Sequence, residues 1–226
     1  MKRHSRLLAL LLIAAAGHAG GLAAQALGIP VRNAGVGTGF GIAADVGFPS
    51  RDAGKGTAFG ATGSAGFGPL GVTATAATWN PEGPQGSIRS VGATGNLKVI
   101  GGPLIPLSVT LQAGAGYYKV TSEGGEAPTI TKTLHVPVGV GLALTIPNPV
   151  FSIKPWVAPR LDVLRTRVES DTPAETSTVT DFGISAGVDF GFLNGLTVRT
   201  MYDRVMRGQG VNPGVISLGL GFRVGS

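Results

Sequence analysis

Residues 181–192 read Asp-Phe-Gly-Ile-Ser-Ala-Gly-Val-Asp-Phe-Gly-Phe, and their pattern decides the class of fold. Every even-numbered position is apolar, and every odd-numbered position is small or acidic. Because successive side chains of a β-strand point to opposite faces, this alternation predicts a strand with one apolar and one polar face. At about 3.3 Å per residue, the stretch is long enough for a tilted crossing of a bilayer, and about twice as long as a usual soluble strand.

The first 26 residues carry the pattern of a secretory signal peptide. Lys2, Arg3 and Arg6 precede an unbroken apolar run over 7–16, and Ala24-Gln25-Ala26 offers small residues where signal peptidase cleaves. The alternative is an uncleaved membrane helix, but the apolar run is shorter than the roughly 20 residues that a span needs. We therefore predict a cleaved signal peptide at 1–26 and one mature domain at 27–226.

The composition argues against a soluble surface and against several kinds of site. Charged residues make up 13% of the chain, about half the usual share, and 38 residues are glycine. The absence of cysteine excludes disulfides and thiolate metal sites. Loss of the three basic residues of the signal would lower the formal net charge from +6 to +3, so we expect no nucleic-acid partner.

The rest of the chain repeats the opening pattern in ten segments. Connections after the odd-numbered segments are long and those after the even-numbered ones are short, which is typical of outer-membrane barrels. We therefore predict an all-β, antiparallel, up-and-down transmembrane β-barrel of ten strands. The predicted strands are 35–48, 57–67, 72–79, 88–100, 107–118, 134–144, 151–163, 181–192, 196–203 and 216–224, with the longest loop at 169–178.

Three prolines interrupt this pattern. Pro137, Pro155 and Pro159 lie inside the sixth and seventh predicted strands, where proline removes a ladder hydrogen bond. We expect bulges or a kink there, and a barrel of eight strands is the alternative if those strands are broken.

The charge-poor polar faces suit a crowded interior better than a solvated surface, so we expect the apolar faces to contact lipid. Five acidic and five basic residues then lie in the predicted lumen, which suggests paired or networked charges, because an unpaired buried charge is costly. Solvated side chains in a wet lumen are the alternative. The predicted lumen charges are Asp45, Asp162, Asp181, Asp189, Asp203, Lys98, Lys154, Arg160, Arg199 and Arg223.

Aromatic residues sort into two levels, as expected of membrane interfaces. The level at the short turns comprises Phe67, Phe151, Phe190, Phe192 and Phe222, and the level at the long loops comprises Phe48, Tyr117 and Tyr202, with Trp79 pointing inward. Between them, the second and third strands offer only Ala61, Ala65, Ala74 and Ala76 to lipid. This weakly apolar strip is either thin membrane padding or an oligomer contact.

With its signal peptide, ten alternating segments and terminal strand, the chain resembles the small bacterial outer-membrane β-barrels of the OmpA/OmpX-like kind over all of 27–226. The resemblance implies location in the bacterial outer membrane with both termini periplasmic. It also implies contact with outer-membrane lipid and lipopolysaccharide, and insertion by the barrel assembly machinery. One departure is the end of the chain, which runs past Phe222 to Arg-Val-Gly-Ser, whereas family members often end on an aromatic residue.

The sequence gives little sign of catalysis. His135 is the single histidine of 27–226, and no serine or acid accompanies it on its own strand face closer than Thr133. We therefore predict that the protein is not an enzyme, with a hydrolase using His135 as the alternative, and we expect no cofactor or metal. The loop acids Glu123, Glu126, Glu169, Asp171 and Glu175 are expected to be solvated, with divalent-cation or lipopolysaccharide-bridging sites as the alternative.

Two functions remain open. Ten strands spaced about 4.8 Å apart and tilted by ~40° enclose a barrel on the order of 20 Å wide. A narrow porin-like passive channel is the main expectation. The alternative is a closed structural or adhesive barrel that acts through its outer loops.

Overall fold

The computed structural model describes residues 26–31, 35–82, 86–102, 105–122, 128–170, 173–207 and 210–225. In these ranges the chain forms one antiparallel sheet and a single turn of 3-10 helix. The strands are β1 (Gly39–Pro49), β2 (Thr57–Phe67), β3 (Leu70–Asn80), β4 (Ile88–Gly102), β5 (Ile105–Ser122), β6 (Thr129–Leu144), β7 (Ile146–Pro147), β8 (Phe151–Glu169), β9 (Glu175–Phe192), β10 (Leu196–Met206) and β11 (Gly214–Val224). No helix in the described ranges is long and apolar enough to cross a membrane.

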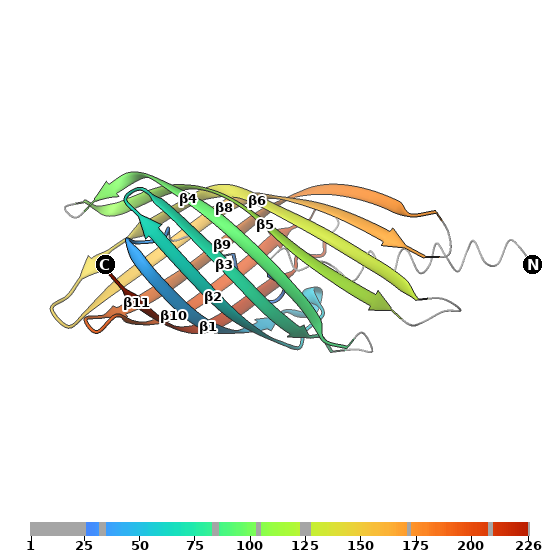
Figure 1. The fold of residues 1–226 in the computed structure, drawn as a ribbon, viewed down its shortest axis with the longest axis horizontal. Coiled ribbons are helices and arrows are strands. Elements are labelled where there is room, and N and C mark those ends of the chain that lie inside the picture. Colours follow the sequence, from blue (N-terminus) through green and yellow to red (C-terminus); the bar gives the residue numbers. More distant parts are fainter. Residues whose placement is uncertain are drawn as a thin grey trace, which may run out of the picture.

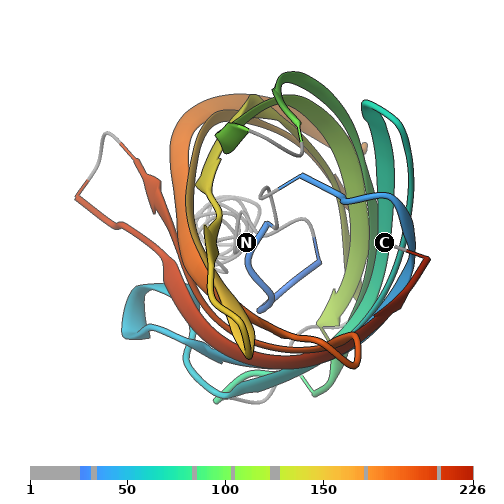
Figure 2. The ribbon, with the colours of Figure 1, turned by 90° about the vertical axis from the view of Figure 1, so that its left-hand side faces the viewer.

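The sheet closes on itself. Apart from the short β7, each strand pairs antiparallel with the next one along the chain; β6 pairs with β8, and β1 pairs with β11 (Figure 1). The two-residue β7 continues β6 along β8, so ten strands form the wall. Viewed along its axis, the wall is a closed ring (Figure 2). The predicted ten-stranded antiparallel barrel is confirmed, and the eight-stranded alternative is wrong.

The wall is much taller on one side than on the other. β1, β2, β3, β10 and β11 each have 11 residues, whereas β5, β6, β8 and β9 have 16 to 19. The extra length lies at the end of the long loops (Figure 1). The loop predicted over 169–178 is therefore wrong, because β8 continues to Glu169 and β9 begins at Glu175. Residues 175–180 are rich in threonine, which favours strands, but both of their faces are exposed, so no apolar alternation marked them.

The first strand begins later than predicted, at Gly39 instead of Gly35. Both glycines have positive φ angles, 75° at Gly35 and 95° at Gly39, so the chain turns at each of them and runs extended only after Gly39. Residues 35–38 instead lead out of the lumen toward β1, and they are considered with the site below.

The prolines do not shift the strand register, so the predicted bulges are wrong. Around Pro137, the pairs Ala113↔Val138 and Gly116↔His135 belong to one continuous register of β5 on β6. Strands β6 and β8 likewise keep their register on both sides of Pro159. The register shifts of the wall occur between β4 and β5 instead, from Lys98 to Gly102 next to the short turn.

The predicted orientation of the faces is confirmed. On β9, Phe182 and Phe192 are exposed, whereas Gly183 and Ser185 are buried. Exposed apolar side chains continue around the outside of the barrel, and large aromatic ones lie near both rims. The exposed members of the two predicted aromatic levels are Phe67, Phe192, Phe222, Phe48, Tyr117 and Tyr202, while Trp79 is buried inside, as expected.

If the outer face contacts lipid, a charged substitution on it should destabilise the barrel more at the middle of a strand than at its end. Leu218 is exposed at the middle of β11, and replacing it by arginine places a charge near the centre of the bilayer. We expect Leu218→Arg to lower the free energy of unfolding in lipid vesicles by about 2–4 kcal/mol, measured by urea titration. The control Leu193→Arg lies in an exposed short turn outside β9, where the cost should be at most about 1 kcal/mol. Equal effects of the two substitutions would contradict the assignment of the outer face to lipid.

Candidate functional site

The described lumen is crossed by a buried network of charged side chains. At its centre is Arg160 on β8, whose guanidinium is enclosed by the wall. Nη1 and Nη2 of Arg160 donate to the two carboxylate oxygens of Asp203 on β10, at 2.6 and 3.0 Å. Nε donates to Oδ1 of Asp162, two residues further along the same strand face, at 2.8 Å. One arginine thus binds two carboxylates, and one of these pairs is bidentate, a strong and directional arrangement.

Two further side chains complete this network. Ser185 on β9 accepts a hydrogen bond from Arg160 Nη1 at 2.6 Å, and its hydroxyl donates to Asp203 Oδ1 at 2.5 Å. His135 on β6 lies on the other side, with Nε2 at 2.7 Å from Oδ1 of Asp162. The network therefore joins β6, β8, β9 and β10 through the interior of the barrel.

Glycine leaves the space that this network occupies. A Cβ added to Gly183 would lie 2.8 Å from Cζ of Arg160 and would overlap the carboxylate of Asp162. Further along the same side of the wall, Gly219 of β11 lies in register between Asp45 of β1 and Arg199 of β10. Arg199 and Asp45 form a second buried ion pair across that glycine, with 3.6 Å between Nε and Oδ1.

The remaining predicted lumen charges lie outside these two clusters. Asp181 pairs with Arg207, which sequence reasoning did not select, at 3.2 Å. Asp189 accepts a hydrogen bond from Trp156 Nε1 at 3.4 Å, and it lies opposite Lys154 in the register of β8 and β9. Arg223 donates to the carbonyl of Gly37 at 2.8 Å, and Lys98 points inward next to the short turn after β4.

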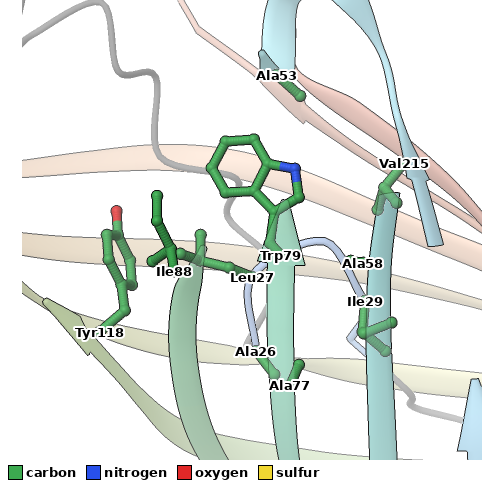
Figure 3. Close-up of a cluster of buried hydrophobic side chains, with 10 residues drawn as sticks. All are labelled: Ala26, Leu27, Ile29, Ala53, Ala58, Ala77, Trp79, Ile88, Tyr118 and Val215. Carbon is green, nitrogen blue, oxygen red and sulfur yellow. The ribbon is translucent and has the colours of Figure 1, made fainter. Parts of the chain in front are cut away.

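The N-terminal part of the described chain lies inside the barrel. Ala26–Val31 enters the lumen at the long-loop end, and residues 35–38 follow toward the short-turn end (Figure 2). Leu27 and Ile29 pack among apolar side chains of the inner wall (Figure 3). The wall residues of this cluster are Ala53, Ala58, Ala77, Trp79, Ile88, Tyr118 and Val215.

Backbone contacts fix the depth of this segment, which we call the lumen segment (26–31). The amide of Leu27 donates to Ser90 Oγ at 2.9 Å. A Cβ on Gly60 would lie 2.9 Å from Ile29 Cγ1, and one on Gly28, where φ is 76°, would overlap Ala58. The lumen segment thus approaches the wall closely at Ala58 and Gly60, where larger residues would collide with it. Gly225 lies at the opposite, short-turn end, near Gly39.

Sequence reasoning missed the lumen segment and the partner of His135. The segment had a weak signal, because Leu27, Ile29 and Val31 are apolar residues outside every predicted strand. His135 was judged alone because its partner, Asp162, lies on a neighbouring strand whose register the sequence did not reveal.

The loop acids do not gather into a cation site among the described residues. Within these ranges no group of three histidine or acidic side chains is placed to hold a metal ion. Glu169 is bound instead by Lys132 Nζ at 2.8 Å and by Arg167 Nε at 3.0 Å. The hydrogen bond from Lys132 holds the pKa of the Glu169 carboxyl below its ordinary value, so Glu169 is ionised at neutral pH. Glu123, Glu126 and Asp171 lie outside the described residues.

Known structures share this architecture, although no protein-family model and no curated protein sequence matches the chain. The outer membrane protease OmpT from Escherichia coli aligns with 83% of this chain and 94% of its own, with a TM-score of 0.50 and 11% identity. The translocator domain of the autotransporter NalP from Neisseria meningitidis aligns with 84% of this chain and 90% of its own, also with a TM-score of 0.50, at 13% identity. The chain has the fold of the small outer-membrane β-barrels. At these identities the likeness concerns the fold alone.

The exterior of this barrel is apolar, as lipid contact requires, and its interior must satisfy its own polar groups. In the network around Arg160, polar side chains satisfy one another by hydrogen bonds and ion pairs. The network also ties three strands of the tall side, β6, β8 and β9, to the neighbouring short strand β10, so it braces the interior of the wall.

This role predicts a large cost for removing the central cation. Arg160→Met leaves Asp162 and Asp203 buried without their shared partner, and we expect it to lower the free energy of unfolding by about 3–5 kcal/mol in a urea titration. Arg165→Met is the matched control on the same strand, because Arg165 points outward and is exposed, and it should cost less than about 1 kcal/mol. The triple variant Arg160→Met, Asp162→Asn, Asp203→Asn should recover part of the loss. Equal stability of Arg160→Met and the control would refute the role of the network.

Proposed function

We propose that the protein is a closed outer-membrane barrel that acts through its tall, surface-exposed side and conducts no solutes through its lumen. The short turns and Gly225 face the periplasm, and the long loops face outward. The observation that carries the proposal is the lumen segment, which occupies the long-loop end of the barrel.

Two separate layers support closure. The lumen segment packs its apolar side chains against the inner wall at the outer end. The second layer is the charged network, in which Arg160, Asp162 and Asp203 are at most 2% exposed, so the side chains around it exclude water. A porin, in contrast, keeps a water-filled channel lined by solvated polar groups.

The tall side supports a function at the cell surface. β8 and β9 pair from Phe151↔Phe192 to Val168↔Glu175, well beyond the height of the neighbouring β10. About seven residues more than in the short strands, at about 3.4 Å each, correspond to roughly 24 Å of additional strand. This extension presents a rigid, threonine-rich sheet rather than flexible loops. The surface suits contact with another macromolecule or structural support.

The same geometry favours a protein without hydrolytic activity. Nε2 of His135 is held by Asp162, and His135 is buried in the wall. Ser185 is the nearest hydroxyl of the network, but its hydrogen bonds go to Arg160 and Asp203. A serine activated for attack needs a base as its partner, and this serine is bound to a carboxylate that an arginine already neutralises.

Conductance in a planar bilayer tests closure. We expect the protein that begins at Ala26 to give no discrete current steps. Gly28→Leu adds a side chain where even a Cβ overlaps Ala58, so it should displace the lumen segment and produce steps or frequent brief openings. Gly68→Leu is the matched control, because Gly68 also has a positive φ, 58°, but faces open space in a short turn.

Current steps of the unaltered protein would overturn the closed-barrel proposal and favour the channel. Folding of all three proteins is verified by heat-modifiable gel mobility. Steps in Gly28→Leu but not in Gly68→Leu would identify the lumen segment as the outer closure.

A further inference from the structure

Basic side chains form a row across four adjacent strands on the outside of the tall wall. Lys119 of β5 lies opposite Lys132 of β6, and Lys132 lies opposite Arg167 of β8. Arg89 of β4 continues the row, since Ser90 pairs with Tyr118 and the next pair in that register is Arg89 with Lys119. The basic row is therefore Arg89, Lys119, Lys132 and Arg167.

The members of the row point away from the lumen. Their neighbours along each strand, Ser90, Tyr118, Thr133 and Thr166, lie on the inner face, and the first three of these are buried. Arg89, Lys119 and Arg167 are exposed, and Lys132 is half-buried. Arg165, on the same face as Arg167, adds a fifth cation one step closer to the membrane.

Little negative charge within the described wall compensates this row. Glu169 is the one acid paired with it, and it binds both Lys132 and Arg167. No ion pair within the described ranges engages Arg89, Lys119 or Arg165. Like charges placed directly opposite on neighbouring strands destabilise a sheet. An external anion between these side chains would relieve that repulsion.

The position of the row identifies the kind of anion. The next outward-facing row toward the membrane is Val91, Tyr117 and Leu134, which are register neighbours and all exposed, and Arg165 lies opposite Leu134 at the end of this row. An exposed tyrosine between aliphatic side chains marks the interface between acyl chains and headgroups. The cations directly above it are at the level of the headgroups, and they are on the wall rather than at the tips of loops.

We propose that the basic row binds the phosphates of an outer-leaflet lipid whose acyl chains lie against Val91, Tyr117 and Leu134. In a bacterial outer membrane this lipid is the phosphorylated lipid A part of lipopolysaccharide. The proposal rests on the part of the proposed function that places the long loops at the cell surface, and it is independent of whether the lumen is closed. Each phosphate bridges two cations of neighbouring strands, which lie about 4.8 Å apart.

The test measures the anisotropy of fluorescent bisphosphorylated lipid A titrated with the purified protein in zwitterionic detergent. The row variant is Arg89→Gln, Lys119→Gln, Arg167→Gln, which keeps the Lys132–Glu169 pair. The control variant is Arg51→Gln, Lys55→Gln, Arg204→Gln, which removes three exposed cations elsewhere on the barrel. At roughly fivefold per cation, we expect the row variant to bind about 100-fold more weakly and the control to change by about threefold or less.

Additional ligands separate the possible sources of the anion. Dephosphorylated lipid A should bind all three proteins equally weakly. Equal losses in the row and control variants, or no loss in the row variant, would overturn the proposal. It would also be overturned if inorganic phosphate or a soluble polysulfated sugar displaced lipid A at similar concentrations, because the row would then be a site for soluble anions. None of these measurements involves ion conduction. A negative result would therefore overturn the lipid A proposal and leave the closed-barrel proposal untouched.

Discussion

Closure of the backbone hydrogen-bond ladder is the constraint on which the rest of this structure depends. Inside a bilayer no water is present to satisfy an open strand edge, so a sheet is stable there only as a complete ring. The pairing of β1 with β11 and of β6 with β8 completes the ring. The ring stays in register around Pro137 and Pro159, although each proline lacks an N–H for the ladder. Register matters because a shift of one residue would turn lumen residues toward the outside.

Closure leaves an interior that the chain must fill with its own atoms. Glycine on the inner face makes room, and the space receives Arg160 with its two carboxylates at mid-height and Leu27 and Ile29 at the outer end. A buried arginine is tolerable only because Asp162 and Asp203 both bind it. The outer face is apolar over most of the barrel and becomes basic at the row of Arg89, Lys119, Lys132 and Arg167. The same period-two alternation therefore supplies both the side chains that fill and brace the lumen and the side chains of the outer face.

The sequence was sufficient for the fold and for much of the composition of the lumen, because period-two alternation is a local property. Phe182 and Ser185 were assigned to the correct faces from neighbours in sequence alone. The partners were harder to predict. The contact of His135 with Asp162 depends on a strand register, and the basic row depends on three registers at once. The extension of β9 over 175–180 was missed because water on both of its faces removes the alternation. The lumen segment was missed because its partners come from β2, β3, β4, β5 and β11.

The central claim, that the chain fills its own lumen, is tested most directly by nuclear Overhauser effects in the refolded protein. The Cδ1 methyl of Ile29 lies close to Gly47 and Gly60 on the inner faces of β1 and β2. In detergent micelles, a protein labelled at isoleucine methyl groups should show cross-peaks between this methyl and the α-protons of both glycines. Cross-peaks of Ile29 only to solvent or detergent, with a folded and heat-modifiable barrel, would contradict the account.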